Sequence, residues 1–261
     1  MGRSSRNTEA SQVLTEVDLA SERLIVETLS PLTKQYQLGI LTEETEDDSS
    51  RHTSDYFWCI DPIDGTLPFI EGTPGYSIVI ALVSREGVPQ LGVIWDVVAD
   101  VPYHVLRGNV AFRGEEAIEA ASTGSSSSSS SLRWFMDRSM VGQSNYNDWH
   151  AALIEAAGAT GLDGVEVIDH AGAALNASWS TLNDHAVYFK CPKKEDGGGS
   201  VWDFAASACL YESLGLPVSD MFGHPLDLNP EGSTFMNRGG VVYASSLEWA
   251  RTVQSIYKEL G

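Results

Sequence analysis

Asp61 and Asp64 stand three residues apart where an apolar run ends, with Pro62 between them and Gly65 and Thr66 directly after. The run predicts a buried strand that stops at Asp61, and Pro62, which has no N–H to donate, stiffens the turn. Both carboxylates then project from one corner, beside free N–H groups at a helix start. Mg²⁺ prefers carboxylate oxygens, and such N–H groups suit a phosphate. The segment therefore predicts a metal site next to a phosphate site; the alternative is a polar turn in which Asp64 caps the helix.

Three further motifs accompany this corner along the chain. They are the pentapeptide Trp202-Asp203-Phe204-Ala205-Ala206, the pair Glu43-Glu44, and Thr15-Glu16-Val17-Asp18. Together with the string from Trp58 to Phe69, they resemble the signatures of the inositol monophosphatase family and follow that family's order. The segments Gly223–Asp227 and Asn237–Gly239 are more similar to its 3'(2'),5'-bisphosphate nucleotidase branch than to its inositol phosphatase branch. The resemblance extends from about Thr15 to the C-terminus.

The resemblance implies a phosphomonoesterase that depends on two Mg²⁺ ions, with room for a weaker third ion held by Glu43 and water. Glu43, Asp61 and the backbone carbonyl of Ile63 are expected to hold one ion. Asp61, Asp64 and Asp203 are expected to hold the second, so that Asp61 bridges the pair. Two such ions can activate a water molecule and stabilise the leaving oxygen of a phosphate ester.

The resemblance also implies roles for residues that contact the substrate. The N–H groups of Gly65 and Thr66 are expected to bind the phosphate. Asp18, Glu43 and Thr66 form the expected catalytic set, in which Asp18 and the Thr66 hydroxyl orient the attacking water. The implied substrate contacts around the metals are Ile63, Asp64, Gly65, Thr66 and Asp203.

Asp18 and Asp203 each have a second interpretation. An aspartate in the first turn of a helix opposes the positive end of the helix dipole and needs no catalytic role. Thr15-x-x-Asp18 also fits a capping box that opens a helix. Trp202 is expected to pack in the interior, and Glu44 is expected to face solvent.

Three of the five lysines, Lys190, Lys193 and Lys194, precede a triglycine at 197–199. One hypothesis is that Lys193 and Lys194 dock a second phosphate of the substrate on a flexible loop. The alternative is a solvated hairpin tip. The two acidic residues that follow the lysines can instead contact sugar or inositol hydroxyls.

The favoured activity is hydrolysis of 3'-phosphoadenosine 5'-phosphate to AMP and phosphate. The alternative is a phosphatase of inositol 1-phosphate or of a related sugar or polyol phosphate. An alternative of another class is a catalytically silent, phosphatase-like binding protein, because family members carry a further helix and a lysine-containing loop where this chain has Met1 to Leu14. The full set of metal ligands favours the enzyme.

Periodicity and turn residues predict the elements that must position these side chains. The N-terminal part is expected to hold a helix over 15–29, a charged loop over 43–55, and an antiparallel meander of strands over 76–84, 90–97 and 102–107. The C-terminal part is expected to alternate helices over 147–157, 171–179, 203–214 and 247–260 with strands over 165–168, 186–189 and 240–244.

These elements divide the chain into an α+β half over 1–121, which carries the metal signature, and an α/β half over 133–261, which supplies Asp203. The serine-rich segment 122–132 between them cannot bury apolar surface and is expected to be a flexible loop. The resemblance implies an α+β fold, the layered α-β-α-β-α sandwich of the inositol monophosphatase and fructose-1,6-bisphosphatase superfamily. The two halves are expected to form one compact catalytic unit.

Composition agrees with a compact enzyme of a small metabolite. The chain has 261 residues, 43% of them hydrophobic, and its formal charge is 16 − 36 = −20. This acidity argues against a nucleic-acid polymer or an anionic membrane as a partner. No apolar run approaches the ~20 residues that span a bilayer, and the polar first residues predict no secretory signal. Three unclustered cysteines favour a location in the cytoplasm. For the oligomeric state, a homodimer is one alternative.

Overall fold

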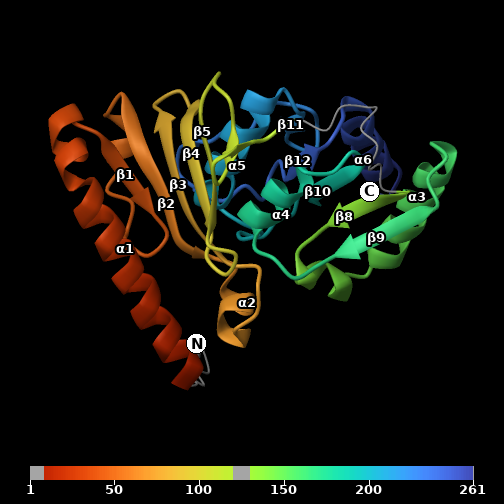
Figure 1. Cartoon of the computed structure of the whole chain (residues 1–261), viewed down its shortest axis with the longest axis horizontal. Coiled ribbons are helices and arrows are strands. Elements are labelled where there is room, and N and C mark those ends of the chain that lie inside the picture. Colours follow the sequence, from red (N-terminus) through yellow and green to blue (C-terminus); the bar gives the residue numbers. More distant parts are fainter. Residues whose placement is uncertain (1–8, 120–129, 261) are drawn as a thin grey trace.

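The structure, a computed structural model, describes residues 9–119 and 130–260. The helices are α1 (Glu9–Tyr36), α2 (Thr66–Glu71), α3 (Tyr146–Ala159), α4 (Ala173–Ser180), α5 (Val201–Leu214) and α6 (Leu247–Leu260), with 3₁₀ turns at Ser50–His52 and Arg138–Gly142. Helices and sheets alternate in layers (Figure 1). Helix α1 covers one sheet, α4 and α5 lie between the two sheets, and α3 and α6 cover the second sheet. This order confirms the expected α-β-α-β-α sandwich.

The first sheet contains seven strands that follow one another in chain order. They are β1 (Gly39–Thr42), β2 (Tyr56–Asp64), β3 (Ser77–Ser84), β4 (Pro89–Asp96), β5 (Val101–Leu106), β6 (Phe112–Arg113) and β7 (Glu116–Ala117). Strands β2 to β5 pair antiparallel, which confirms the predicted meander. Strand β1 pairs parallel with β2 and was not predicted, because four residues carry too little periodicity to be recognised.

The second sheet has the order β11-β12-β10-β8-β9. Its strands are β8 (Ser131–Phe135), β9 (Gly164–Ile168), β10 (Ala186–Lys190), β11 (Val218–Ser219) and β12 (Val241–Ala244). Strands β9, β8 and β10 run parallel, and β12 pairs antiparallel with β10. The predicted strands β9, β10 and β12 are confirmed, whereas β8 and β11 were not predicted.

Small residues let α5 approach the first sheet closely. A Cβ atom at Gly92 of β4 would lie 2.5 Å from the carbonyl oxygen of Ala206, so only glycine fits under this helix. Ala205, Ala206 and Ala208 are buried, as expected for a helix enclosed between two sheets. This packing holds the first turn of α5, which carries Asp203, beside β2.

Helix α1 corrects one prediction. It begins at Glu9, so Thr15-x-x-Asp18 lies inside the helix and does not open it. The helix also buries Asp18 and Glu22, which are 8% and 5% exposed, while Leu24 is 66% exposed. The buried side of α1 therefore carries acidic groups, because it covers the end of β2 where the two aspartates lie.

The serine-rich segment falls largely outside the described residues. Residues 122–129 are not described, and Ser131 already belongs to β8. The division of the chain at this segment stays a prediction. Within the described part of the chain, no helix combines the length and the apolar character that crossing a bilayer requires.

Candidate active site

Strand β2 presents Asp61 and Asp64 at its end. It runs to Asp64, three residues beyond the predicted stop at Asp61. The register with β3 shifts between Asp61 and Asp64, and Pro62, which cannot donate to a ladder, lies within that irregularity. The Asp61 carboxylate accepts the N–H of Ile63 at 2.9 Å. The predicted corner therefore exists as an irregular strand end rather than as a turn after the strand.

Asp64 caps a helix, but not the helix that follows it. Its two carboxylate oxygens accept the N–H groups of Ala173 at 3.0 Å and Ala174 at 2.9 Å, in the first turn of α4. Gly172 makes room for this contact, because a Cβ atom there would lie 2.5 Å from Asp64 Oδ2. Helix α2 instead begins after Gly65, whose φ of 89° is in the left-handed region that glycine tolerates. The local alternative, in which Asp64 caps α2, is wrong.

Asp203 brings the third carboxylate from α5. It stands in the first turn and forms a capping box with Ser200, so the helix-start interpretation holds. Carboxylate oxygens of Asp61, Asp64 and Asp203 lie within 4.8 Å of one another. Trp202 is partly buried against the core, as expected.

The carboxylate cluster Asp61, Asp64 and Asp203 is electrostatically unfavourable without a cation. Burial, reinforced by the charge of Asp203, raises the pKa of Asp64 to about 7. Burial and the neighbouring Glu43 raise the pKa of Asp61 well above its ordinary value, and burial also raises the pKa of Asp203. Several oxygen donors that repel one another in a small buried space are the donor set that a hard divalent cation requires. These residues therefore fit Mg²⁺.

Glu43 joins the cluster from the loop after β1. Glu43 as a whole is exposed, but protein atoms surround its carboxyl group. Desolvation, with a smaller contribution from repulsion by Asp203, raises the pKa of Glu43 to about 7. Its carboxyl group lies within hydrogen-bonding reach of Asp61. Glu44 is half-buried, contrary to the expectation that it faces solvent. The reason is Glu22 of α1, whose carboxylate accepts the Glu44 N–H at 3.0 Å and so fixes this loop.

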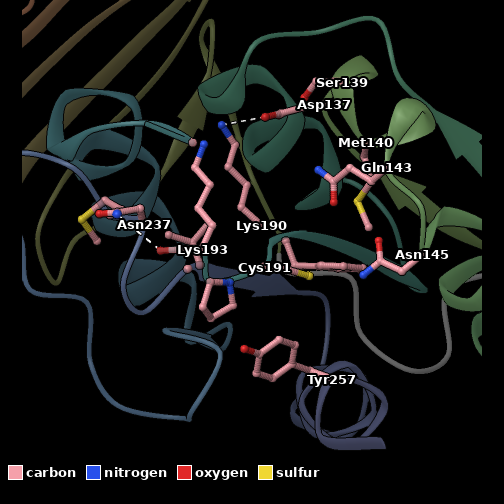
Figure 2. A pocket seen from close by; sticks show the side chains of 16 residues that line it. Asp137, Ser139, Met140, Gln143, Asn145, Lys190, Cys191, Lys193, Asn237 and Tyr257 are labelled. Atoms are coloured by element: carbon pink, nitrogen blue, oxygen red, sulfur yellow. Dashed lines mark hydrogen bonds and ion pairs between the residues drawn. The ribbon is translucent and has the colours of Figure 1, made fainter. Parts of the chain in front are cut away.

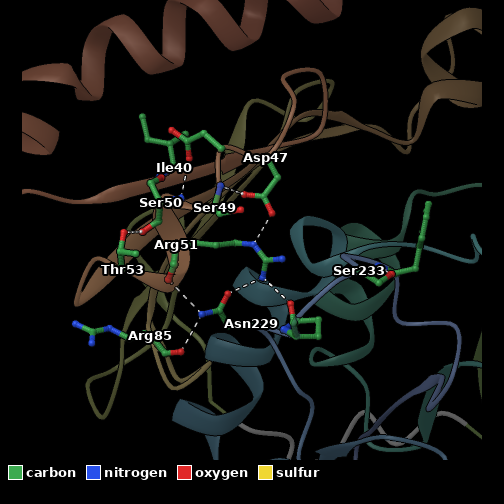
Figure 3. Close-up of polar contacts among 12 residues, drawn as sticks. Ile40, Asp47, Ser49, Ser50, Arg51, Thr53, Arg85, Asn229 and Ser233 are labelled. Atoms are coloured by element: carbon green, nitrogen blue, oxygen red, sulfur yellow. Dashed lines mark hydrogen bonds and ion pairs between the residues drawn. The ribbon is translucent and has the colours of Figure 1, made fainter.

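A buried arginine fastens the far end of the same loop (Figure 3). Arg51 is 2% exposed and pairs with Asp47 at 2.7 Å. Its guanidinium also donates to Asn229 Oδ1 at 2.6 Å and to the Pro230 carbonyl at 2.9 Å. The loop that carries Glu43 is thus held from α1 at one end and from the C-terminal part of the chain at the other.

Asp18 lies on the side of α1 that packs on β2. Three residues further along the helix, the Ser21 hydroxyl donates to the Pro62 carbonyl at 3.2 Å, which holds this turn against the site strand. Burial, with a contribution from Glu44, raises the pKa of Asp18 to about 6. The pairing of Asp18 with Thr66 on one water molecule stays a prediction.

A cavity of about 250 Å³ opens beside the cluster. Its lining includes Asp64, Asp203, Gly65 and Thr66, so the predicted phosphate-binding residues and two of the predicted metal ligands share one space. Thr66 is exposed at the first position of α2. Glu43 and Asp18 are not among the lining residues of this cavity.

Lys190, which belongs to the lysine cluster of the sequence but was not among the predicted site residues, also lines this cavity. It ends β10, and its ammonium group lies 2.7 Å from the Asp137 carboxylate (Figure 2). Its side chain is 16% exposed. Lys193 and Lys194 are both exposed, but Lys193 lines a neighbouring cavity of about 320 Å³, whereas Lys194 lines neither cavity. A charged residue that closes the apolar run of 186–189 was the signal that could have identified Lys190.

Comparison with known proteins agrees with this geometry. The model of the inositol monophosphatase family matches residues 2–259. The chain is 30% identical over 227 residues to the Nus factor SuhB of Pseudomonas aeruginosa, covering 82% of this chain and 74% of that protein. It is 27% identical over 252 residues to the 3'(2'),5'-bisphosphate nucleotidase CysQ of Aggregatibacter actinomycetemcomitans, covering 89% and 80%.

Solved structures share the fold. Inositol monophosphatase-II from Staphylococcus aureus MSSA476 superposes with a TM-score of 0.74 at 20% identity, over 98% of this chain and 88% of that one. Similar structures of SaIMPase-II hold 2'AMP or inositol monophosphate, with TM-scores of 0.71 and 0.68. The family match spans nearly the whole chain, and the carboxylate cluster contains three of the side chains that the resemblance implies as metal ligands. The chain therefore belongs to the inositol monophosphatase family and is a metal-dependent phosphoric monoester hydrolase.

Proposed function

We propose that this hydrolase is a 3'(2'),5'-bisphosphate nucleotidase, which converts 3'-phosphoadenosine 5'-phosphate and water into AMP and phosphate. The observation that carries the proposal is a second cavity, lined by Lys193, that adjoins the cavity of Asp64 and Asp203 and shares Asp137, Ser139 and Lys190 with it. A cation beyond those that the carboxylates bind suits a substrate with a second anionic group. The relative CysQ, which bears the name of this activity, supports the same choice.

The carboxylates of Asp61, Asp64 and Asp203 are proposed to hold Mg²⁺, with Glu43 and the Ile63 carbonyl as further ligands. Mg²⁺ bound there would supply Lewis-acid polarisation of the phosphate and a nucleophilic water at neutral pH. The N–H groups of Gly65 and Thr66 are proposed to donate to the non-bridging phosphate oxygens at the start of α2.

The remaining groups act on water and the leaving oxygen. Asp18 and the Thr66 hydroxyl are proposed to orient a water molecule toward the phosphorus. With a pKa of about 6, Asp18 is ionised near neutral pH and can accept a hydrogen bond from that water. The water oxygen bonds to phosphorus, the bond from phosphorus to the ribose 3' oxygen breaks, and that oxygen takes up the proton that the water releases. Phosphate and AMP are the products.

Two further features extend the proposal. All three cysteines lie in the described part of the chain and are free thiols, which supports a cytoplasmic location. The partner proposed from the −20 charge is a small phosphorylated metabolite rather than a nucleic-acid polymer.

A substrate comparison tests the proposal. Phosphate release is measured from 3'-phosphoadenosine 5'-phosphate, inositol 1-phosphate and fructose 1,6-bisphosphate, each with Mg²⁺ and with EDTA. The expected result is release only with Mg²⁺ and the highest kcat/KM for the bisphosphate nucleotide. A higher kcat/KM for inositol 1-phosphate would establish the polyol phosphatase instead. No release from any substrate would favour the silent binding protein.

A further inference from the structure

A second cavity adjoins the catalytic one and has no role in the chemistry described above. It measures about 320 Å³ and shares Asp137, Ser139 and Lys190 with the catalytic cavity (Figure 2). A ligand held at the carboxylate cluster can therefore extend past the Lys190–Asp137 pair into this space. Ligand cavities begin at roughly 300 Å³, so the volume suits a small organic group.

The two lysines of this cavity differ in their surroundings. The Lys190 ammonium is already paired with Asp137 at 2.7 Å. The Lys193 side chain runs in the same direction in Figure 2, and its outer atoms lie close to Gly197 and Gly198. A Cβ atom at Gly198 would approach Lys193 Cε to 2.9 Å, and one at Gly197 would approach its Nζ to 3.2 Å. The glycines thus leave the space that the Lys193 side chain occupies.

Lys193 is also anchored through its backbone. Its N–H donates to the Asn237 carbonyl at 2.8 Å, and the Asn237 amide donates to the Glu195 carbonyl at 2.9 Å. Within residues 9–119 and 130–260, the ion pairs do not include the Lys193 ammonium. The ammonium groups of Lys34, Lys194 and Lys258 likewise form no ion pair, and among these described lysines Lys193 is the one that lines the second cavity. Its ammonium group is suited to an anion that arrives with the ligand.

The rest of the lining has the chemistry of a heteroaromatic site. Met140 and Met236 contribute thioethers, which make favourable contacts with aromatic rings. Gln143 and Asn145 contribute side-chain amides that can donate to and accept from ring nitrogens. Tyr257 from α6 closes the side opposite the lysines in Figure 2. A polyol, whose hydroxyls point to all sides, would leave several of its hydrogen bonds unmade against the thioethers.

We infer that the second cavity binds the nucleoside 5'-phosphate part of the substrate, with the 5'-phosphate against Lys193 and the base between the thioethers and the amides. The inference rests on the proposed function for the position of the scissile phosphate. It gives Lys193 a specificity role, since a monophosphate held only at the carboxylate cluster does not reach it. Lys194, which does not line the cavity, has no part in this contact.

Calorimetric titration with AMP and with adenosine tests the inference. The titrations contain Mg²⁺ and saturating inorganic phosphate, so that the catalytic phosphate site is filled and AMP has only the second cavity to enter. The parent chain should bind AMP about fivefold more tightly than adenosine, because a partly exposed ammonium–phosphate contact is screened by water. Lys193→Ala should abolish this difference and leave adenosine affinity within about twofold. Lys258→Ala, which removes the same charge beside Tyr257 but outside the cavity, is the matched control and should retain the difference.

The outcomes separate this inference from the proposed function. Equal affinities of the parent chain for AMP and adenosine would overturn the inference, even where 3'-phosphoadenosine 5'-phosphate is hydrolysed. The inference would also be overturned if Lys194→Ala or Lys258→Ala reduced the preference for AMP over adenosine as much as Lys193→Ala does. The net charge of the protein would then explain the effect. If Lys193 controls AMP binding but no phosphate ester is hydrolysed, the cavity assignment stands and the proposed function fails.

Discussion

Gly172 controls the position of Asp64, and replacing it with alanine perturbs one metal ligand without changing any charge. The backbone at Gly172 has φ −66° and ψ 172°, a conformation that alanine adopts without strain. The added Cβ atom would lie 2.5 Å from Asp64 Oδ2 and 2.6 Å from Oδ1, closer than nonbonded atoms approach. The Asp64 carboxylate must therefore leave its place at the start of α4.

The expected magnitude follows from the bonds that Asp64 loses. It accepts N–H groups from Ala173 and Ala174, and a hydrogen bond to a charged group contributes about 1.5–3 kcal/mol. Alanine also restricts the unfolded chain more than glycine does, which stabilises the folded state by roughly 0.4–1 kcal/mol and offsets part of this loss. The free energy of unfolding should thus fall by roughly 2–5 kcal/mol. Loss of a group that orients a ligand typically lowers metal affinity about 10–100-fold, and the Mg²⁺ concentration for half-maximal activity should rise by that factor.

Two measurements check Gly172→Ala. Urea unfolding at pH 8 gives the stability, and phosphate release over a Mg²⁺ series gives the metal requirement. Gly158→Ala is the control, because Gly158 lies in α3 with no atom within 4 Å of the added Cβ. That control should be stabilised by up to about 1 kcal/mol with an unchanged Mg²⁺ requirement. An unchanged Mg²⁺ requirement in Gly172→Ala would refute the assignment of Asp64 as a ligand held by α4.

Three further predictions follow from the carboxylates. Asp203→Asn should lower kcat by roughly 100-fold or more, since a charged ligand is lost, while circular dichroism shows the parent fold; full turnover at saturating Mg²⁺ would contradict it. In EDTA, the melting temperature should fall as the pH rises from about 4.5 to 7.5, because Asp64 and Glu43, each with a pKa of about 7, bind more protons folded than unfolded. Added Mg²⁺ should remove this decline. A melting temperature that does not change with pH in EDTA would refute the repulsion among these carboxylates. Li⁺ on the order of tens of millimolar should inhibit in competition with weakly held Mg²⁺, and insensitivity would show that the Glu43 side of the site differs from the family's.

The chemistry-bearing residues were predictable from local strings. Asp61, Asp64 and Asp203 each stand in a motif whose spacing is legible in the sequence, and the structure brings their oxygens together. Most helices and strands of the C-terminal half were also predicted, because each has a clear period bounded by turn residues. Strand β1, with four residues, was too short for such a signal.

Long-range contacts were not predictable in the same way. Asp64 is bound by N–H groups 109 and 110 positions later in the chain, and no local pattern reports that pairing. Lys190 meets Asp137 because β10 and β8 are parallel neighbours, a fact of sheet order. The Thr15-x-x-Asp18 pattern was misleading because helix α1 extends to Glu9.

The orientation of helix α1 was also not predictable from local sequence. Its buried side carries Asp18 and Glu22, whereas the apolar Leu24 is exposed. Hydrophobic periodicity identifies the side of a helix that faces an apolar core, and here the helix faces a polar site. Only the location of the carboxylates at the end of β2 makes this orientation understandable.

The proposed metal site is tested most directly by a crystal structure of the chain grown with Mn²⁺ and inorganic phosphate, with anomalous diffraction recorded for the metal. Two Mn²⁺ ions are expected, bound by Asp61, Asp64, Asp203 and Glu43, with phosphate density against the N–H groups of Gly65 and Thr66. Absence of metal peaks from this carboxylate cluster, at Mn²⁺ concentrations that support phosphate release, would show that these residues are not the metal site of the enzyme.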